Sequence, residues 1–375
     1  MTLAASTSAF LEQRGRAGLQ LLGSLQAYAG SALLARARSD FEAHAPTSAP
    51  RAASWPPATP EGWRASLDDT RARAEKSLAY RYNRFFQRWV AEEQYRRGIP
   101  ATERRRARLD VPLTPARHSA RPSRLILDPS LRMPGWYAGV EWHLQLGGYD
   151  GYDLASPMFV AGIGRFIFSR GGYAAVPVGK DIRAHRAQVL QQLDNRSPRR
   201  LYDMGCGGSL MLTMARQQFP DAELVGGDLS AALLKSGLAM SEALGAGITF
   251  RQEDACAVAE ADRSVDAVVS FAVFHEMPDE VARRALQEMF RILRPGGQMV
   301  ISDPPPLRAV SPLDATVLDW ETENRAEPYF TEAAIRDLPA MMRAAGFVEV
   351  SERSLDGELS YPWITLGKKP GQEKK

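Results

Sequence analysis

Apolar runs of strand length alternate with helical patterns through the second half of the chain. The strand-like runs fall at 201–204, 222–227, 248–251, 265–271 and 298–302. Apolar residues recur at helical spacing between and after them, over 209–219, 230–243, 279–293 and 331–345. Strands that alternate with helices in this way predict a parallel sheet with helices on both faces. Two further strand-like runs, 347–350 and 360–366, close the pattern.

Long helices dominate the pattern in the first half of the chain. Helical spacing predicts one helix or a helix pair over 9–42 and a second long helix over 61–97, with a proline-rich linker or surface loop at 40–60. The second helix carries an aromatic stripe, which suits a packing face against the predicted α/β domain or against a partner subunit in a homodimer. Residues 98–135 are basic and proline-rich, and their one strand-like run is Leu125-Ile126-Leu127.

The segment 136–180 mixes aromatic residues with glycines and carries His143. Glycine turns that present Trp, Tyr and His side chains suit a lid over a small ligand, and they suit equally an aromatic loop that packs without touching a ligand. As a lid, the segment would bring three tyrosines to a substrate: Tyr149, Tyr152 and Tyr173.

These patterns divide the chain into four parts. They are a helical cap at 1–135, the connecting segment and candidate lid at 136–180, a catalytic domain at 181–366, and a disordered tail at 367–375.

The strand-like run at Leu201 leads into a glycine-rich turn, and a helical pattern follows. The turn reads Asp203-Met204-Gly205-Cys206-Gly207-Gly208-Ser209. Glycines let a backbone approach a ligand closely, and the following helix aims unpaired N–H groups at the turn. Ser209 is placed to cap that helix with its hydroxyl oxygen.

Polar residues follow the other strand-like runs. Asp228 ends the second run about 20 positions on, where a carboxylate can accept hydrogen bonds from ribose hydroxyls. Asp254, His275 and Asp303 follow the third, fourth and fifth runs. Open α/β sheets bind ligands at the carboxyl ends of their strands, so the sequence predicts a nucleotide-type site along that edge.

In these motifs, residues 180–366 resemble the catalytic domain of class I S-adenosylmethionine-dependent methyltransferases of the small-molecule type. The glycine-rich turn matches the family's first motif, Asp228 its ribose acid, Asp254-Ala255 its adenine-contacting pair, and Leu293-Arg294-Pro295-Gly296-Gly297 the turn before its fifth strand. One departure is Gly208-Ser209, where the family usually has a third glycine.

The resemblance implies a Rossmann-like α/β fold with a mostly parallel, seven-stranded sheet and S-adenosyl-L-methionine as the cofactor. The cofactor-binding residues that it implies are Asp203, Gly205, Cys206, Gly207, Asp228, Leu229, Asp254, Ala255 and Phe271.

Composition narrows the setting of the protein. The 375 residues carry a net charge of +3 and only two cysteines, Cys206 and Cys256, which favours a reducing, cytoplasmic compartment over a disulfide framework. No run of 18 apolar residues is present, so we expect no membrane span. The five histidines and two cysteines form no recognisable ligand set, so we expect no metal site. The cluster Arg104-Arg105-Arg106-Ala107-Arg108 favours a solvated surface over a nucleic-acid contact.

Candidate catalytic residues follow from the chemistry of a sulfonium cofactor. Alignment of the acceptor supplies most of the acceleration, and a base is needed only for a neutral hydroxyl, a carbon acid or a protonated amine. His275 is the first candidate base and His143 the second, while a purely structural role stays open for each. Asp303 is a candidate for lining the acceptor pocket.

The predicted function is methyl transfer to a small molecule whose accepting atom the sequence leaves open. Two alternatives remain. One is an S-adenosylmethionine lyase or cyclase on the same fold, and the other is an RNA-directed methyltransferase or binding module that uses the basic N-terminal region.

Overall fold

The computed structural model describes residues 11–44, 55–109, 121–173, 175–180, 182–355 and 361–371. Part of the predicted linker, part of the basic segment and the end of the predicted tail lie outside these ranges. Among the described residues, no helix is both long and apolar enough to span a bilayer.

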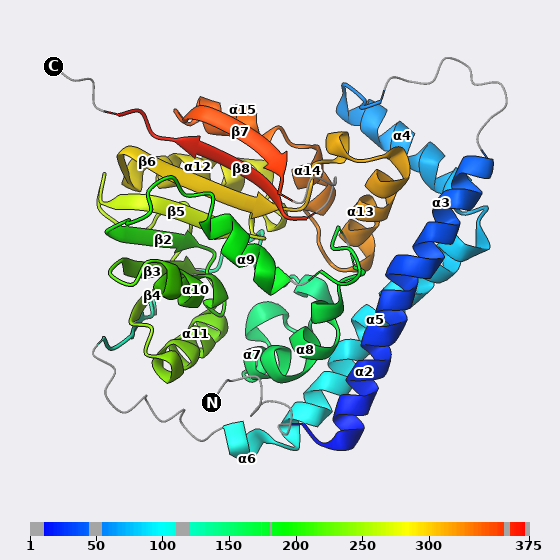
Figure 1. The fold of residues 1–375 in the computed structure, drawn as a ribbon, viewed down its shortest axis with the longest axis horizontal. Helices are drawn as coiled ribbons and strands as arrows, with labels where there is room; N and C mark the ends of the chain where they lie inside the picture. Colours follow the sequence, from blue (N-terminus) through cyan, green and yellow to red (C-terminus); the bar gives the residue numbers. More distant parts are fainter. Residues whose placement is uncertain are drawn as a thin grey trace.

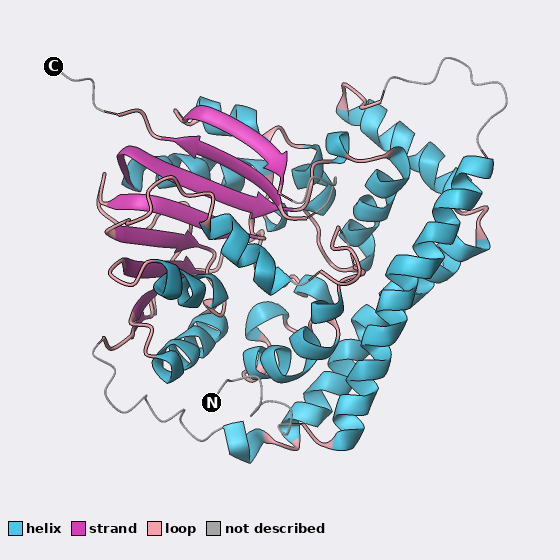
Figure 2. Ribbon diagram, in the orientation of Figure 1, coloured by secondary structure: helices cyan, strands magenta, loops and turns pink. Residues whose placement is uncertain are grey.

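A mostly parallel sheet forms one side of the molecule (Figures 1 and 2). In the described chain it has eight strands, in the order β1, β4, β3, β2, β5, β6, β8, β7. β1 to β6 pair in parallel, and β8 runs antiparallel to both β6 and β7. The bounds are β1 Arg124–Ile126, β2 Arg200–Met204, β3 Glu223–Asp228, β4 Ile248–Gln252, β5 Val265–Phe271, β6 Leu293–Asp303, β7 Val348–Ser354 and β8 Trp363–Lys368. This is the predicted α/β architecture with its closing antiparallel pair.

The sheet has one strand more than the seven predicted, because the run at Leu125 adds to its edge as β1. Hydrogen bonds on either side of the neighbouring Ser123 fix this edge strand. Its Oγ accepts from the N–H of Ile248 at 3.1 Å, and its own N–H donates to Glu242 at 2.6 Å. The N-terminal half of the chain is therefore joined directly to the sheet.

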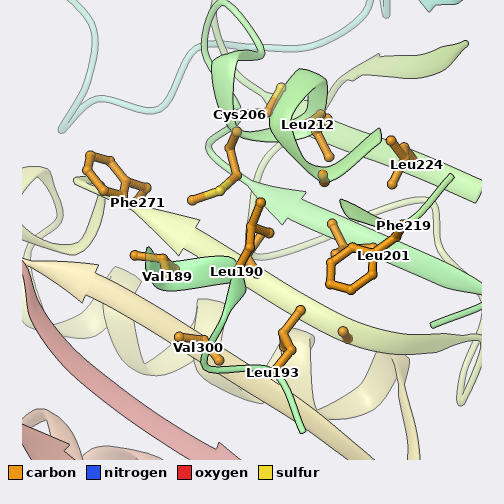
Figure 3. Packing of buried hydrophobic residues seen from close by; sticks show 14 of the residues in the cluster. Val189, Leu190, Leu193, Leu201, Cys206, Leu212, Phe219, Leu224, Phe271 and Val300 are labelled. Atoms are coloured by element: carbon orange, nitrogen blue, oxygen red, sulfur yellow. The ribbon is translucent and has the colours of Figure 1, made fainter. Parts of the chain in front are cut away.

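Helices cover both faces of the sheet, as predicted. On one face lie α9 (Ile182–Leu190), α10 (Leu210–Gln218) and α11 (Ala231–Leu244), and on the other lie α12 (Asp279–Ile292) and α15 (Leu338–Ala344). Figure 3 shows the first of these two cores, where residues of α9 and α10 meet the strands. The buried side chains there include Val189, Leu190, Leu201, Leu212 and Val300. Each face of the sheet therefore has its own hydrophobic core.

The N-terminal helices form a long layer beside the sheet (Figure 1). The helix or helix pair predicted over 9–42 is formed by α2 (Gln13–Tyr28) and α3 (Leu34–Ala43). A π-helical turn at Ala29–Leu33 joins them without a break. The second predicted helix is two helices, α4 (Pro60–Ala74) and α5 (Leu78–Glu103), because Ser77 begins a new helix and accepts from the N–H of Tyr80. α5 continues past the predicted end, through Pro100, and a short α6 (Arg106–Leu109) follows.

A helix that the sequence pattern did not predict lies between β6 and the late strands. α13 (Pro312–Asn324) packs against α3, α4 and α5 through two hydrophobic clusters, and the aromatic side chains of Trp63 and Tyr80 are buried there. After it, the single helix predicted over 331–345 is split into α14 (Phe330–Ile335) and α15. α13 thus connects the N-terminal layer to the carboxyl ends of the strands.

The aromatic connecting segment folds into short turns and helices. They comprise 3-10 turns at Trp142–Leu144, Gly148–Asp150 and Phe168–Arg170, α7 (Ala155–Met158), a π-helical turn at Phe159–Ile163, and α8 (Gly164–Phe166). α7 and α8 lie between the N-terminal layer and the sheet (Figure 1).

Candidate functional site

The glycine-rich turn after β2 has the backbone geometry that its sequence predicts. Gly205 has a φ of 69°, and a Cβ atom there would come within 2.6 Å of the side chain of Val273. Gly207 has a φ of 50°, and its N–H donates to Oδ2 of Asp228 at 2.8 Å. The turn and the end of β3 are thereby held together, which leaves a backbone concavity at the edge of the sheet.

The cap predicted for Ser209 is not formed. Its backbone is left-handed, with φ 66° and ψ 21°, and its side chain accepts no hydrogen bond from the first turn of α10. A capping serine needs an extended backbone to aim its oxygen at those N–H groups. Here the N–H of Ser209 donates to the carbonyl oxygen of Cys206 at 2.9 Å, so Ser209 belongs to the turn itself.

A cavity of about 470 Å³ lies at the carboxyl ends of the parallel strands. This volume is in the range of small-molecule sites. All nine residues that the resemblance implies for the cofactor line it: Asp203, Gly205, Cys206, Gly207, Asp228, Leu229, Asp254, Ala255 and Phe271. His143, Tyr149, Tyr173 and His275 line the same cavity. The structure therefore brings together residues from both the sheet and the candidate lid.

Two of the predicted substrate residues do not reach this cavity. Tyr152 turns toward the N-terminal layer, where its hydroxyl donates to Oε1 of Glu103 at 2.8 Å. Asp303 lies behind His275, and its Oδ1 is 2.5 Å from Nδ1 of that imidazole. Asp303 therefore orients a residue of the cavity without lining the cavity itself.

Burial controls the charge of the acidic residues near the glycine-rich turn. Asp203 is only 1% exposed, and burial raises its pKa to about 8, although Arg186 opposes this. Burial also raises the pKa of Asp228 to about 6, against the lowering effect of the N–H groups of Ser230 and Gly207. Burial raises the pKa of the Cys206 thiol well above its usual range, so this thiol is not a nucleophile.

A second group of charged side chains lies at the other end of the cavity. Nδ1 of His143 is 2.5 Å from Oε1 of Glu327, and Nε2 of His275 is 3.8 Å from Oε2 of the same carboxylate. The hydroxyl of Tyr149 donates to Glu276 at 2.5 Å and lies 2.8 Å from Nε2 of His143. These side chains come from the lid, from the loop after β5 and from the loop after α13.

The carboxylates of this group raise the pKa of both histidines. For His143, burial alone would lower the pKa, but Glu327 and Glu276 outweigh it and raise the value to about 10. For His275, burial is likewise outweighed, by Asp303 first and by Glu327 and Glu276 next, and the pKa rises to about 9. Both imidazoles therefore carry a proton at neutral pH in the ligand-free chain and donate hydrogen bonds.

The candidate lid contacts the start of α11 at one turn and is packed internally at another. Asp150 accepts hydrogen bonds from the hydroxyl of Ser230 at 2.9 Å and from the N–H of Ala232 at 3.1 Å, at the start of α11. Trp142 is 1% exposed, and its ring stacks on that of Tyr149. His143 itself has a left-handed backbone, with φ 56°. Such a conformation is costly for a non-glycine residue and is retained where the surroundings determine it.

Sequence reasoning missed three residues that shape the cavity. Glu327 and Arg325 lie in the loop after α13, a helix that the sequence pattern did not predict. Arg186 lies on α9. A buried acidic residue in a loop has no periodic or motif signal. Glu276 was noted only as a neighbour of His275, and its contact with Tyr149 depends on the tertiary fold.

Comparisons with known proteins match the region that carries the glycine-rich turn. Residues 201–297 match the family model of a methyltransferase domain. Demethylmenaquinone methyltransferase of Thermus thermophilus is 33% identical over 128 residues, which cover 34% of this chain and 57% of that protein. Ribosomal RNA small subunit methyltransferase C of Hahella chejuensis is 29% identical over 116 residues, which cover 30% and 33%.

These relatives are matched over only part of their length, so the shared region is the domain and not the whole protein. A solved structure described as a putative O-methyltransferase from Nostoc punctiforme aligns over 59% of this chain and 63% of its own. The sequence identity is 17% and the TM-score is 0.44, which is too low to support an inference. The family match and the relatives concern the region that carries the glycine-rich turn and Asp228. Residues 201–297 of this chain belong to the class I S-adenosylmethionine-dependent methyltransferases.

Proposed function

We propose that this protein transfers the methyl group of S-adenosylmethionine to a small-molecule acceptor held between the glycine-rich turn and the candidate lid. The observation that supports this most is the continuity of the cavity. One volume of about 470 Å³ is lined by Asp203 and Asp228 at one end and by His143, Tyr149 and His275 at the other. A cofactor and a second small molecule would therefore share one continuous space.

The cofactor residues of the family fit the chain's own geometry. Asp228 would hold the ribose, because its carboxylate already lies at the tip of β3 and is fixed by two N–H groups. Asp254 and Ala255 would contact the adenine, and the turn at 205–207 would face the amino acid part of the cofactor. When bound, S-adenosylmethionine supplies an activated methyl group on a positively charged sulfur.

His143, His275 and Tyr149 would position the acceptor at the other end of the cavity. Alignment of the acceptor with the methyl group is the main contribution a protein makes to this reaction. Aromatic walls from the lid and polar groups fixed by carboxylates suit a small, partly polar acceptor. We propose the N-terminal helices as the cap that closes this space, through their contact with α13.

An RNA acceptor is less well supported. The basic cluster runs from the end of α5 into α6, and three of its arginines form ion pairs within the chain. Arg104 and Arg105 pair with Glu12 at 3.3 and 3.8 Å, and Arg106 pairs with Asp153 at 2.7 Å. Cations that are paired in this way offer less to a phosphate backbone.

The predicted subunit contact stays a prediction, with Tyr82 and Phe85 of α5 exposed by 50% and 58%.

Product analysis tests the proposed reaction. The full chain is incubated with S-adenosylmethionine and pools of small hydroxyl, amine, carbon-acid and thiol compounds, and the nucleoside product is identified by mass spectrometry. Methyl transfer releases S-adenosylhomocysteine, and we expect this product with at least one pool. Release of methylthioadenosine would instead assign the chain to the lyase or cyclase reaction. Failure to bind S-adenosylmethionine at all would contradict the proposal.

A further inference from the structure

Three possible metal ligands converge at the acceptor end of the cavity. His275, Glu276 and Glu327 each offer one ligand atom, and these atoms all lie within 4.8 Å of one another. All three residues line the cavity. Two come from the loop after β5, and the third comes from the loop after α13. The fold, and not a local sequence motif, brings them together.

Each of these three side chains has a supporting partner. Nδ1 of His275 is 2.5 Å from Asp303, whose other oxygen accepts from the N–H of Phe274 at 2.9 Å. Oε1 of Glu327 lies 2.5 Å from His143, and Glu276 accepts from the hydroxyl of Tyr149. A carboxylate on the far nitrogen of a histidine is the arrangement that orients most metal-binding histidines. It leaves Nε2 of His275 facing the carboxylates.

One oxygen in the group has no hydrogen-bond partner. Glu327 is only 4% exposed, and its Oε2 is buried without a donor. Nε2 of His275 lies 3.8 Å from this oxygen, which is too far for a hydrogen bond. A buried carboxylate oxygen left in this state costs free energy unless a cation or donor joins it. This orphaned atom is a second observation, besides the ligand spacing, that the group has an unfilled acceptor position.

We propose that His275, Glu276 and Glu327 bind a divalent transition-metal ion in the acceptor end of the cavity. Imidazole and carboxylate ligands together suit ions such as Mn²⁺ and Zn²⁺. With metal–ligand distances of about 2.1 Å, tetrahedral ligand atoms lie roughly 3.4 Å apart, so the three side chains must move inward by under about 1 Å. Three protein ligands also leave a position open for a further ligand, as in catalytic sites.

Three carboxylates around the site face the two protonated imidazoles of His143 and His275, so the group keeps a net negative charge. A metal ion bound to Nε2 of His275 would take the place of the proton there, while Nδ1 keeps its contact with Asp303. Glu276, Glu327 and Asp303 provide three carboxylates at or directly behind the ligands. Arg325, which also lines the cavity, pairs with Glu321 at 3.0 Å and donates to Gln87. His143 is held by Glu327 and lies outside the three ligands.

The site would determine the class of acceptor, and in this respect the inference depends on the proposed function. The open position faces the cavity, where an acceptor oxygen could complete the coordination. A hydroxyl bound to a divalent ion loses its proton more readily than a free one. The acceptor would therefore be an oxygen ligand, such as an enol or a hydroxy acid, with Tyr149 beside it.

Calorimetric titration with MnCl₂ and ZnCl₂ tests the site directly. The full chain is first treated with a chelator, and S-adenosylmethionine is omitted so that metal binding is measured alone. We expect one saturable site per chain. Glu327→Gln and Glu276→Gln should each weaken metal binding by about tenfold or more. Glu253→Gln, a buried glutamate at the other end of the same cavity, should leave it unchanged.

Several outcomes would overturn the inference. The first is the absence of saturable metal binding, and the second is equal metal affinity in wild type and both glutamine variants. The third is stabilisation of the chain by an organic ammonium ion without metal binding. This third outcome would assign the carboxylates to a cationic acceptor. If Glu327→Gln does not fold, Glu276→Gln decides. A separate titration with S-adenosylmethionine distinguishes this failure from that of the proposed function, because cofactor binding does not require the metal.

Discussion

Nδ1 of His143 lies 2.5 Å from Oε1 of Glu327, and this contact joins the candidate lid to the loop after α13. His143 belongs to the candidate lid and Glu327 to the loop between α13 and α14, and both line the cavity. His143 adopts a left-handed backbone to make the contact, while Glu327 is almost fully buried. The pair therefore holds the candidate lid against the loop that follows α13. The acceptor space is shaped by segments outside the family's recognisable motifs.

Replacing Asp228 tests the ribose contact. Asp228→Ala removes the carboxylate at the tip of β3, and we expect the affinity for S-adenosylmethionine to fall by roughly 1–3 kcal/mol because hydrogen bonds to the ribose are lost. Titration calorimetry measures this loss. Asp221→Ala, at a side chain that is 94% exposed, is the matched control and should bind normally. Equal affinity in the two variants would count against the assigned ribose site.

Replacing Gly205 separates crowding from backbone strain. In Gly205→Ala the new methyl group meets Val273 at 2.6 Å, and the positive φ adds strain. Gly296→Ala has a similar φ of 79° but meets no atom within 4 Å. We expect Gly296→Ala to lose about 1–2 kcal/mol of unfolding free energy, and Gly205→Ala to lose a further 1–3 kcal/mol, on the order of an overpacked core.

Denaturant unfolding of both glycine variants measures these losses. Gly205→Ala should also bind S-adenosylmethionine more weakly, because Val273 lines the cavity and must move. Equal stability and equal cofactor affinity in the two variants would contradict this account, because they would show that a methyl group at position 205 fits without displacing Val273.

The buried carboxyl of Asp203 predicts a pH dependence of stability. Its pKa is raised from 3.8 to about 8, so the folded chain retains a proton that the unfolded chain loses. This contribution is fully present below about pH 4 and is lost as the pH rises to about 8, with a slope of up to about 1.4 kcal/mol per pH unit.

Asp203→Asn removes this titration, and Asp221→Asn is the exposed control. Thermal unfolding at pH 6 and pH 9 should show wild type and the control losing more stability than Asp203→Asn over that interval. Parallel losses in all three proteins would mean that Asp203 is ionised throughout.

Tyr149 and Tyr152 offer a matched pair for the acceptor pocket. Tyr149→Phe removes a hydroxyl that contacts both Glu276 and His143, whereas Tyr152→Phe removes one outside the cavity. With any acceptor that supports turnover, Tyr149→Phe should reduce kcat/KM by about tenfold, since a lost contact of 1.4 kcal/mol has that effect, and should leave cofactor affinity unchanged. A larger effect from Tyr152→Phe would move the acceptor pocket elsewhere.

The sequence predicted the sheet well, because its strands have a simple periodicity, and the residues that the motifs implied for the cofactor all line one cavity. It did not predict α13, because Leu313 and Val317 pack against one cluster while Leu318 packs against another. Apolar residues on several sides of a helix leave no single stripe to recognise. The break between α4 and α5 was also missed, although Ser77 is a residue type that commonly begins helices.

The sequence identified only some of the residues at the acceptor end of the cavity. His143 and His275 were identified as residue types suited to proton transfer, and both line the cavity. Glu327 had no signal, because its position depends on the packing of α13 against the N-terminal helices. The proximity of three segments distant in sequence is a property of the tertiary fold and follows from no local pattern.

A crystal structure with S-adenosylhomocysteine tests the central claim most directly. Our account predicts a ligand at the carboxyl ends of the strands, with its ribose hydroxyls within hydrogen-bond distance of Asp228 and its amino acid part against the turn at 205–207. The sulfur should then point along the cavity toward His275 and Tyr149. Ligand density elsewhere, or side chains of the protein filling this space in the complex, would contradict the account.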